Sequence, residues 1–391
     1  MRVKGTLDTI VVGLGAMGSS ALLHLATRGV NVLGLDQFPI GHDRGSSHGH
    51  SRMIRTCYYE HPDYVPLLRR AYELWRELES QSGERLLFTP GGVYMGTADS
   101  EAVAGSLRAA LQHGLAHEML SRRDLARRFP QFDVPDDFIA LFEPAAGWLA
   151  PERIIEAQVK LAGAHGANIR TGERVESWKA DSSGGCVRTS HAEYRANTLI
   201  IAAGAWASRV VSDLGVTIAP TRQVLGWFDP PDRARFADAN APVWAMQTPK
   251  SWDGRADLFY GFPISSESPT GRPSLKLARH VAGPSIDPDL DGREPRPGDE
   301  DDIRPFLRRF MPTADGPLSA LRICMYENSP DGHFIIDTHP KHANVVIAAG
   351  FSGHGFKFAS VVGEVLADLA TRAETIHPIG FLGLHRFRQP V

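Results

Sequence analysis

Three glycines close to the N-terminus have the spacing of a turn that binds dinucleotides. Gly13, Gly15 and Gly18 fit the pattern G-x-G-x-x-G and stand between an apolar run at 10–12 and a stretch whose apolar residues have helical spacing. In such turns one glycine permits a tight bend, one lets the backbone approach a pyrophosphate, and one allows the helix to pack closely on the strand. Free N–H groups at the start of the helix face the phosphates. The stretch therefore predicts a dinucleotide site.

An acidic residue follows the second apolar run of this unit. Asp36 comes directly after the run 30–35, about 20 residues beyond the glycine turn, where a carboxylate can accept hydrogen bonds from a ribose. A glycine pattern alone is weak support, because an ordinary turn can show it. Here strand, turn, helix, strand and acid occur in the order that a βαβ unit requires. A carboxylate disfavours a 2′-phosphate at this position, so the sequence favours FAD or NAD over NADP.

Two later segments favour a cofactor that stays bound. The apolar run 198–201 ends in Ala-Ala-Gly at 202–204, and no second G-x-G-x-x-G occurs, so a separate domain for a pyridine nucleotide is not expected. Another apolar run, at 345–349, leads into a glycine-rich loop that ends in Lys357 and is followed by a helical pattern. This order places N–H groups and a lysine at an anion or cofactor. Retained FAD is therefore favoured over NAD that exchanges in each turnover.

Composition and charge describe an ordinary globular protein. The chain has 391 residues, of which 42% are hydrophobic and 22% charged, and its formal net charge is −3. These values give no indication of a nucleic-acid or membrane partner, and no apolar run is long enough to span a bilayer. The N-terminus shows no signal peptide, and Cys57, Cys186 and Cys324 are odd in number and far apart. We therefore expect a cytoplasmic protein without disulfides and without a metal site.

The pattern of elements indicates an α/β fold (α+β overall). The segment 141–149 looks rich in turns, and the middle of the chain alternates short apolar runs with turns, which is typical of a mixed β-sheet. Helical spacing of apolar residues predicts helices at 64–79, 100–113, 121–129, 151–165, 303–310 and 358–370. We expect a Rossmann-like FAD-binding domain made of 1–85, 151–220 and 321–391, interleaved with a mixed β-sheet substrate domain made of 86–150 and 221–320.

Several motifs, in their order along the chain, resemble those of the monomeric sarcosine oxidase and N-methyl-L-tryptophan oxidase family. The resemblance extends over nearly the whole chain and is far more specific than the glycine pattern alone. The motifs are GLGAMG with Asp36, GSSHGHSRMIR, LFEPAAGWL, RQVLGWF, YGFP, LKLARH, CMY, HFIIDTHP and GFSGHGFKFAS.

This resemblance implies a flavin oxidase. Members attach FAD through a cysteine sulfur to the 8α-methyl group of the flavin, and the matching position is Cys324. Without the resemblance, a cysteine in an apolar strand is most often a small buried hydrophobic residue. Members remove two electrons from a C–H bond next to a secondary amine, and flavin N5 receives a hydride equivalent. The imine then hydrolyses, and O₂ reoxidises the flavin to give hydrogen peroxide.

The resemblance also implies roles for individual side chains. Lys276 matches a lysine over flavin N5 that activates O₂ by stabilising developing superoxide, whereas by sequence alone it is as well explained as a solvent-facing lysine of a strand. Arg52 and His48 match an arginine and a histidine near the flavin. Arg55 and Lys357 match a pair that binds the substrate carboxylate. The positions that match the lining of the substrate cavity are Tyr260, His280 and Tyr326.

The predicted site residues are grouped by role. The catalytic set is Lys276, Arg52, His48 and His280, with no general base assigned, and the substrate-binding set is Arg55, Lys357, Tyr260 and Tyr326. The cofactor-binding set is Gly13, Gly15, Met17, Gly18, Asp36, Gln37, Ser46, Ser47, Arg52, Val175, Gly204, Cys324, Gly353, Gly355, Phe356 and Lys357.

Two departures from the family pattern bear on the substrate. Where the family has His-His-Gly-Asp, this chain has Ser47-His48-Gly49-His50, so that His50 replaces an acid beside the flavin. The connection between Tyr260 and Lys276 also carries extra residues, ISSESPTGRP, at the expected rim of the cavity. Both departures affect the expected substrate more than the expected reaction.

The leading hypothesis is an FAD-dependent oxidase of a secondary or N-methyl amino acid, of the sarcosine or N-methyl-L-tryptophan type, that releases formaldehyde. Its partners are a small amino acid and O₂, and we expect a monomer. One alternative keeps the flavin and takes a cyclic imino acid (proline or pipecolate) or a D- or primary amine. Another is a dehydrogenase that passes electrons to a protein or quinone, against which Lys276 argues. A flavin-binding protein without turnover and an NAD-dependent dehydrogenase are the remaining alternatives.

Overall fold

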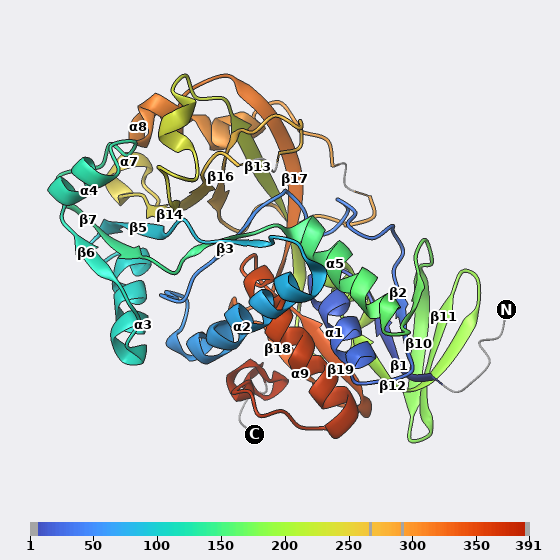
Figure 1. The fold of residues 1–391 in the computed structure, drawn as a ribbon. Coiled ribbons are helices and arrows are strands. Elements are labelled where there is room, and N and C mark those ends of the chain that lie inside the picture. Colours follow the sequence, from blue (N-terminus) through green and yellow to red (C-terminus); the bar gives the residue numbers. More distant parts are fainter. Residues whose placement is uncertain (1–6, 266–267, 291–292, 388–391) are drawn as a thin grey trace.

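Two eight-stranded sheets and the helices that cover them form most of the described chain, which comprises residues 7–265, 268–290 and 293–387 of a computed structural model. Figure 1 shows one sheet made of strands from the first segment, from 168–201 and from the last segment of the chain, and the other made of strands from the segments between them. The expected α/β fold with interleaved parts is confirmed. A third, small sheet consists of β3 (Arg52–Ile54), β8 (Gly147–Leu149) and β4 (Leu87–Phe88).

The first sheet carries the nucleotide-binding unit. Its order is β10-β11-β12-β1-β2-β9, and β19 pairs with both β12 and β18. The pairs β1·β2, β1·β12, β2·β9 and β12·β19 are parallel, as expected for central strands made of Val, Ile and Leu that are buried on both faces. The strands are β1 (Leu7–Val12), β2 (Val32–Leu35), β9 (Asn168–Arg170), β10 (Val175–Asp181), β11 (Gly184–Thr189), β12 (Glu193–Ile201), β18 (Ile335–His339) and β19 (His342–Ala349).

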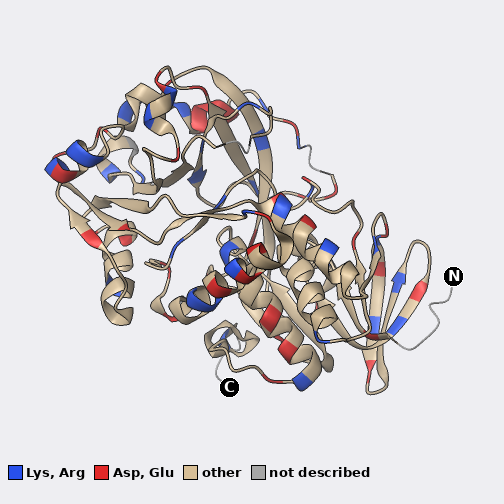
Figure 2. Ribbon diagram, in the orientation of Figure 1, with Lys and Arg blue, Asp and Glu red and all other residues tan. Residues whose placement is uncertain are grey.

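Four helices pack together over this sheet: α1 (Ala16–Thr27), α2 (Val65–Ser82), α5 (Pro151–Ala164) and α9 (Ala359–Arg372). The contact of α1 with α9 is close, because a Cβ atom at Gly363 would lie 2.1 Å from Ser20 Oγ. Pro151 begins α5, where its missing N–H costs nothing, and Gly83 ends α2 in the left-handed region at φ 72°. Figure 2 shows acidic and basic residues interspersed along α2 and α9.

The second sheet has the order β17-β13-β16-β15-β14-β5-β7-β6. An aromatic core packs on one of its faces, where the Phe306 ring stacks on Trp244 at 5.5 Å and on Phe259 at 4.2 Å. The strands are β5 (Gly92–Thr97), β6 (Glu118–Leu120), β7 (Phe138–Glu143), β13 (Ala219–Phe228), β14 (Val243–Gln247), β15 (Leu258–Phe262), β16 (Leu275–His280) and β17 (Leu318–Asn328). The shorter helices are α3 (Ser106–His113), α4 (Arg122–Arg128), α6 (Ala207–Val210), α7 (Lys250–Asp253) and α8 (Arg304–Phe310).

The predicted elements and the observed ones differ in two places. The segment 141–149, expected to be rich in turns, contains the end of β7 and all of β8, with a turn only between them. The expected helix at 100–113 begins with a π-helical turn, Glu101–Gly105, before α3. The exact domain bounds stay a prediction, and β17 runs across position 320. Within the insertion ISSESPTGRP, residues 266–267 lie outside the described residues.

The ends of several strands meet where the two sheets adjoin. The carboxyl ends of β1, β12 and β19 are neighbours in the parallel part of the first sheet, and each leads directly into a loop. Ligands of open α/β sheets bind at such an edge. In the described residues, no helix is both long enough and apolar enough to cross a membrane.

The glycine turn offers a test that separates folding from cofactor binding. A Cβ atom at Gly18 would lie 1.7 Å from the carbonyl oxygen of Gly13, whereas at Gly15 the nearest atom is Ser47 Oγ at 3.6 Å. We expect Gly18→Ala to destabilise the apo-protein by about 1–3 kcal/mol, the range for overpacked sites. Gly15→Ala, the matched control, should keep the apo-protein stability and weaken dinucleotide binding. Urea unfolding of both apo-variants measures this, and equal stabilities would contradict it.

Candidate functional site

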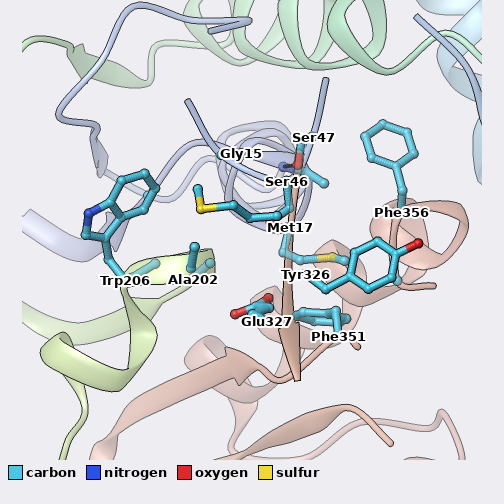
Figure 3. A pocket seen from close by; sticks show the side chains of 18 of the residues that line it. Gly15, Met17, Ser46, Ser47, Ala202, Trp206, Tyr326, Glu327, Phe351 and Phe356 are labelled. Atoms are coloured by element: carbon cyan, nitrogen blue, oxygen red, sulfur yellow. Dashed lines mark hydrogen bonds between the residues drawn. The ribbon is translucent and has the colours of Figure 1, made fainter. Parts of the chain in front are cut away.

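A cavity of about 690 Å³ is lined by residues of both sheets and of the loops between them. Figure 3 shows Met17, Ser46 and Ser47 on one side of it and Tyr326 with Glu327 on another, while Trp206 and Phe356 lie toward opposite ends of the view. Such a concave site with a few polar groups is where a cofactor and a small substrate bind.

At one end of the cavity, the glycine turn and Asp36 form a cradle. Gly13 has φ 89°, and a Cβ atom there would lie 2.4 Å from the carbonyl oxygen of Ala202, so the turn needs glycine at this position. The two carboxylate oxygens of Asp36 accept hydrogen bonds from the N–H groups of Leu14 and Phe38, both at 2.8 Å. Burial raises the pKa of Asp36, and these two N–H groups oppose the rise. Each oxygen keeps a lone pair that can accept from a ribose hydroxyl.

Arg52 joins the loop after β2 to the wall that carries Cys324. Its guanidinium donates to the carbonyl oxygens of Ser46 and Ser51, both at 2.9 Å, and lies 3.5 Å from the sulfur of Cys324. Cys324 stands on β17 with 1% of its surface exposed, and it lines the cavity. A thiol and a fixed positive charge therefore meet at the cavity wall.

Lys276 is buried, so the solvent-facing interpretation is wrong. Only 2% of its surface is exposed, and Nζ donates to the carbonyl oxygens of Gly49 and Ser51 at 2.6 and 2.8 Å and to Ser51 Oγ at 3.2 Å. The amine also lies 4.8 Å from the centre of the Phe262 ring. Burial, and then the charge of Arg52, lower the pKa of Lys276 well below its usual value.

Two buried cations and one carboxylate lie together at the other end of the cavity. The Arg55 guanidinium is 2.7 and 2.5 Å from the two carboxylate oxygens of Glu60 and stacks on Tyr59 at 4.0 Å. Lys357 Nζ donates to the carbonyl oxygen of His354 at 2.9 Å, and burial followed by repulsion from Arg55 lowers the pKa of Lys357 to about 7. Burial alone would raise the pKa of Glu60, but Arg55, His354 and Lys357 lower it to about 2. Arg55 and Glu60 are therefore a charged pair.

Two histidines near the cavity are held in the neutral form. His280 Nδ1 lies 2.9 Å from the hydroxyl of Tyr326, the Tyr260 ring packs edge-on against its imidazole, and burial lowers the pKa of His280 to about 4. Burial, Arg52 and Lys276 lower the pKa of His48 well below its usual value, and its Nε2 has no hydrogen-bond partner among the described residues. Neither imidazole adds positive charge at neutral pH.

Most of the predicted site residues meet in this one cavity. Three do not line it in the part of the chain that the structure describes: Gly18 packs under Gly13, while His48 and Lys276 lie behind the wall. The predicted residues that line it are Gly13, Gly15, Met17, Asp36, Gln37, Ser46, Ser47, Arg52, Arg55, Val175, Gly204, Tyr260, His280, Cys324, Tyr326, Gly353, Gly355, Phe356 and Lys357.

Two acidic residues important to the site were absent from the sequence predictions. Glu60 pairs with Arg55, and Glu152, in the first turn of α5, accepts hydrogen bonds from the N–H groups of Gly49 at 2.6 Å and His50 at 3.1 Å. A carboxylate therefore lies beside His50, which replaces the acid of the family pattern. In the sequence, Glu60 is visible only as an acid close after Arg55, and Glu152 only as an acid after Pro151. Neither position identifies the group that the carboxylate binds.

The residues present fit an extended dinucleotide. The cradle at Asp36 suits a ribose, Gly15 leaves the approach to the start of α1 open, and Ser46 Oγ is buried in the wall without a hydrogen-bond partner among the described residues. An orphaned polar atom facing a cavity indicates a bound group that satisfies it. The described residues contain no cluster of His, Cys, Asp and Glu that could hold a metal ion.

Comparisons with known proteins agree with this geometry. The profile of a family described as "FAD dependent oxidoreductase" matches residues 8–369. The chain is 41% identical to the monomeric sarcosine oxidase of Streptomyces avermitilis, covering 97% of this chain and 98% of that protein. It is 35% identical to the N-methyl-L-tryptophan oxidase of Citrobacter koseri, covering 98% and 99%.

Solved structures show the same fold. The open form of NikD, described as an unusual amino acid oxidase essential for nikkomycin biosynthesis, superimposes with a TM-score of 0.83 at 25% identity, covering 97% of this chain and 98% of that chain. The match of the family profile and the full-length similarity to the two oxidases rest on the segments that line the cavity as well as on the rest of the chain. The chain therefore belongs to the FAD-dependent oxidoreductase family, in the group that includes monomeric sarcosine oxidase and N-methyl-L-tryptophan oxidase.

Proposed function

We propose that this chain oxidises the secondary amine of a small N-methyl amino acid, with FAD attached to Cys324 and with O₂ as the electron acceptor. The observation that carries the proposal is that Arg55 and Lys357 line the same cavity as Cys324, so one site offers an anion grip and a point of flavin attachment. The similarity to sarcosine and N-methyl-L-tryptophan oxidases supports an N-methyl substrate.

When bound, FAD would supply the two-electron chemistry that converts the amine to an imine and reduces O₂ to hydrogen peroxide, and water would hydrolyse the imine and release formaldehyde. The protein has to bind the substrate, orient it, and control charge around the reacting atoms.

Arg55 and Lys357 hold the substrate carboxylate. In the structure the Nη2 group of Arg55 contacts both carboxylate oxygens of Glu60, while Nη1 donates to the carbonyl oxygen of Cys57. A substrate carboxylate would therefore take the place of the Glu60 carboxylate on Arg55. Lys357 adds a second donor from the loop after β19. Because a guanidinium binds a carboxylate through two parallel hydrogen bonds, this exchange also fixes the orientation of the amine.

The substrate amine then lies near neutral side chains. A hydride leaves a carbon next to a nitrogen lone pair, so the amine must be unprotonated to react. Because the pKa values of His280 and His48 are lowered, both imidazoles are neutral and do not make the local electrostatic potential more positive. The pair of His280 with the Tyr326 hydroxyl offers hydrogen-bonding atoms at the amine.

Attachment of the flavin at Cys324 is supported by the position of the thiol. The sulfur lines the cavity, and the Arg52 guanidinium lies 3.5 Å away, so a fixed positive charge stands beside the sulfur that would bond to the flavin. The three cysteines are unpaired, which supports action in a reducing compartment such as the cytoplasm, and the similarity to enzymes named monomeric supports a monomer.

The flavin attachment gives the first prediction. We expect the purified chain to remain yellow in the pellet after acid precipitation, because a thioether survives acid. Cys324→Ala should release its colour into the supernatant. Cys186→Ala, a thiol on β11 away from the cavity, is the matched control and should behave as the unaltered chain. Yellow supernatant from the unaltered chain would sink the Cys324 assignment but not the fold.

Binding of the carboxylate gives a prediction with a pH dependence. Lys357 is charged below its lowered pKa of about 7 and neutral above it, whereas the pKa of Arg55 is raised and its charge persists. Inhibition by propionate, which has no amine to titrate, should therefore weaken as pH rises through about 7. In Lys357→Met the inhibition constant should be about tenfold higher and independent of pH over this range. Equal pH profiles for both proteins would contradict the assignment.

Activation of O₂ gives a third prediction for this site. Lys276→Met should slow the reaction of the reduced enzyme with O₂ by about 10²–10³-fold, because a preorganised charge that stabilises developing superoxide is lost. In the unaltered enzyme the same rate should fall as pH rises, because the lowered pKa of Lys276 lets its charge disappear. Stopped-flow measurement of flavin absorbance follows this step. A Lys276→Met rate that equals the unaltered one would show that Lys276 only anchors the loop at Gly49.

A further inference from the structure

A buried carboxyl group in the cavity wall has no role in the chemistry described above. Glu327 stands near the end of β17, three positions after Cys324, and only 6% of its surface is exposed. It lines the cavity, and its Oε2 atom has no hydrogen-bond partner among the described residues. A buried polar atom without a partner is unfavourable, so a group that satisfies it is expected.

The rest of the carboxyl group is fixed by the main chain. N–H groups of Gly350 and Phe351, at the end of β19, hydrogen-bond to the Glu327 carboxyl group. Burial nevertheless raises the pKa of Glu327 to about 8, with these two N–H groups opposing the rise. At neutral pH the group therefore exists largely as a carboxylic acid, which can both donate and accept a hydrogen bond.

The strand geometry indicates which part of FAD this oxygen meets. Successive side chains of β17 alternate between its two faces, so Glu327 points away from the face of Cys324 and Tyr326. Figure 3 shows its carboxyl group directed toward Ala202 and Met17, which lie beside the glycine turn. FAD bound with its pyrophosphate at that turn and its flavin attached to Cys324 would place the ribityl chain, with its hydroxyl groups, between the two.

We propose that Glu327 Oε2 hydrogen-bonds a ribityl hydroxyl group of FAD and thereby positions the flavin relative to Cys324. This inference rests on the proposed attachment at Cys324 for the direction in which FAD extends. A hydroxyl group suits the site because it can accept a hydrogen bond from the carboxylic acid or donate one to the unpartnered oxygen. Glu327 is thus a positioning residue that acts on cofactor binding and not on the reacting bond.

A purely structural role is the competing explanation. By holding the N–H groups of Gly350 and Phe351, Glu327 also ties the loop after β19 to β17. If Glu327 only holds this loop, its replacement should weaken the binding of FAD and of every FAD analogue equally. If Glu327 contacts a ribityl hydroxyl, its replacement should weaken the binding only of those compounds that carry this hydroxyl.

The experiment compares FAD with FAD analogues that each lack one ribityl hydroxyl, by titration of apo-protein in a Cys324→Ser background that prevents covalent attachment. We expect Glu327→Leu to raise the Kd for FAD about tenfold and Glu327→Gln to change it little, because the amide also donates and accepts. For the analogue that lacks the contacted hydroxyl, Glu327→Leu should no longer raise the Kd. Glu176→Leu removes an exposed acid of the same wall and should show no dependence on the analogue.

Two outcomes would overturn the proposal. An unchanged FAD affinity in Glu327→Leu would show that the carboxyl group makes no contact with the cofactor. An equal penalty for FAD and for every deoxy analogue would show a structural role only, and a matching loss in urea stability would identify it. Peroxide formation by the unaltered chain tests the proposed function separately, since the titration requires binding alone.

Discussion

The hydrogen bonds from Lys276 to the carbonyl oxygens of Gly49 and Ser51 join the two halves of the site. Lys276 stands on β16 of the second sheet, whereas the loop that it holds follows β2 of the first sheet and carries Ser46, Ser47 and Arg52. Hydrogen bonds to a charged group contribute about 1.5–3 kcal/mol each, and here they lie in a buried environment. With Glu152 holding the other side of the same loop, the cavity has a wall that is fixed from both sheets.

Several cations lie in the wall of this cavity or directly behind it. Arg52, Arg55 and Lys357 line it, and Lys276 lies directly behind it, while Glu60 neutralises only Arg55. Buried unpaired cations are unfavourable, and the lowered pKa values of Lys276 and Lys357 reflect this cost. In the proposed function, a substrate carboxylate supplies a counter-charge for Lys357. The site is therefore less favourable empty than full, which favours retention of its ligands.

Local sequence signals predicted the elements that form the site, and contacts between distant segments set its details. The glycine turn, α1, α5 and α9 followed from spacing, because the residues that define each of them lie within a few helical turns. The partner of Gly49 could not be predicted, since Glu152 is about a hundred residues away and an acid at a helix start is common. The sequence also could not predict that Lys276 and His48 lie behind the wall. The alternation of side chains along β16 predicts the face on which Lys276 lies, but not the loop that covers this face. Family resemblance predicted site positions that spacing alone did not, and most of them line the cavity.

In the proposed function, the Arg55–Glu60 pair makes substrate recognition an exchange of one carboxylate for another. Before binding, Arg55 already has a charged partner, so its own buried guanidinium is paired in the free enzyme. The gain from the new ion pair is largely cancelled by the loss of the old one. What remains to set affinity is the free energy of solvating the displaced Glu60 and of packing the remainder of the substrate. Selectivity among amino acids should thus come from their amine and side-chain substituents, because all of them carry the carboxylate that binding requires.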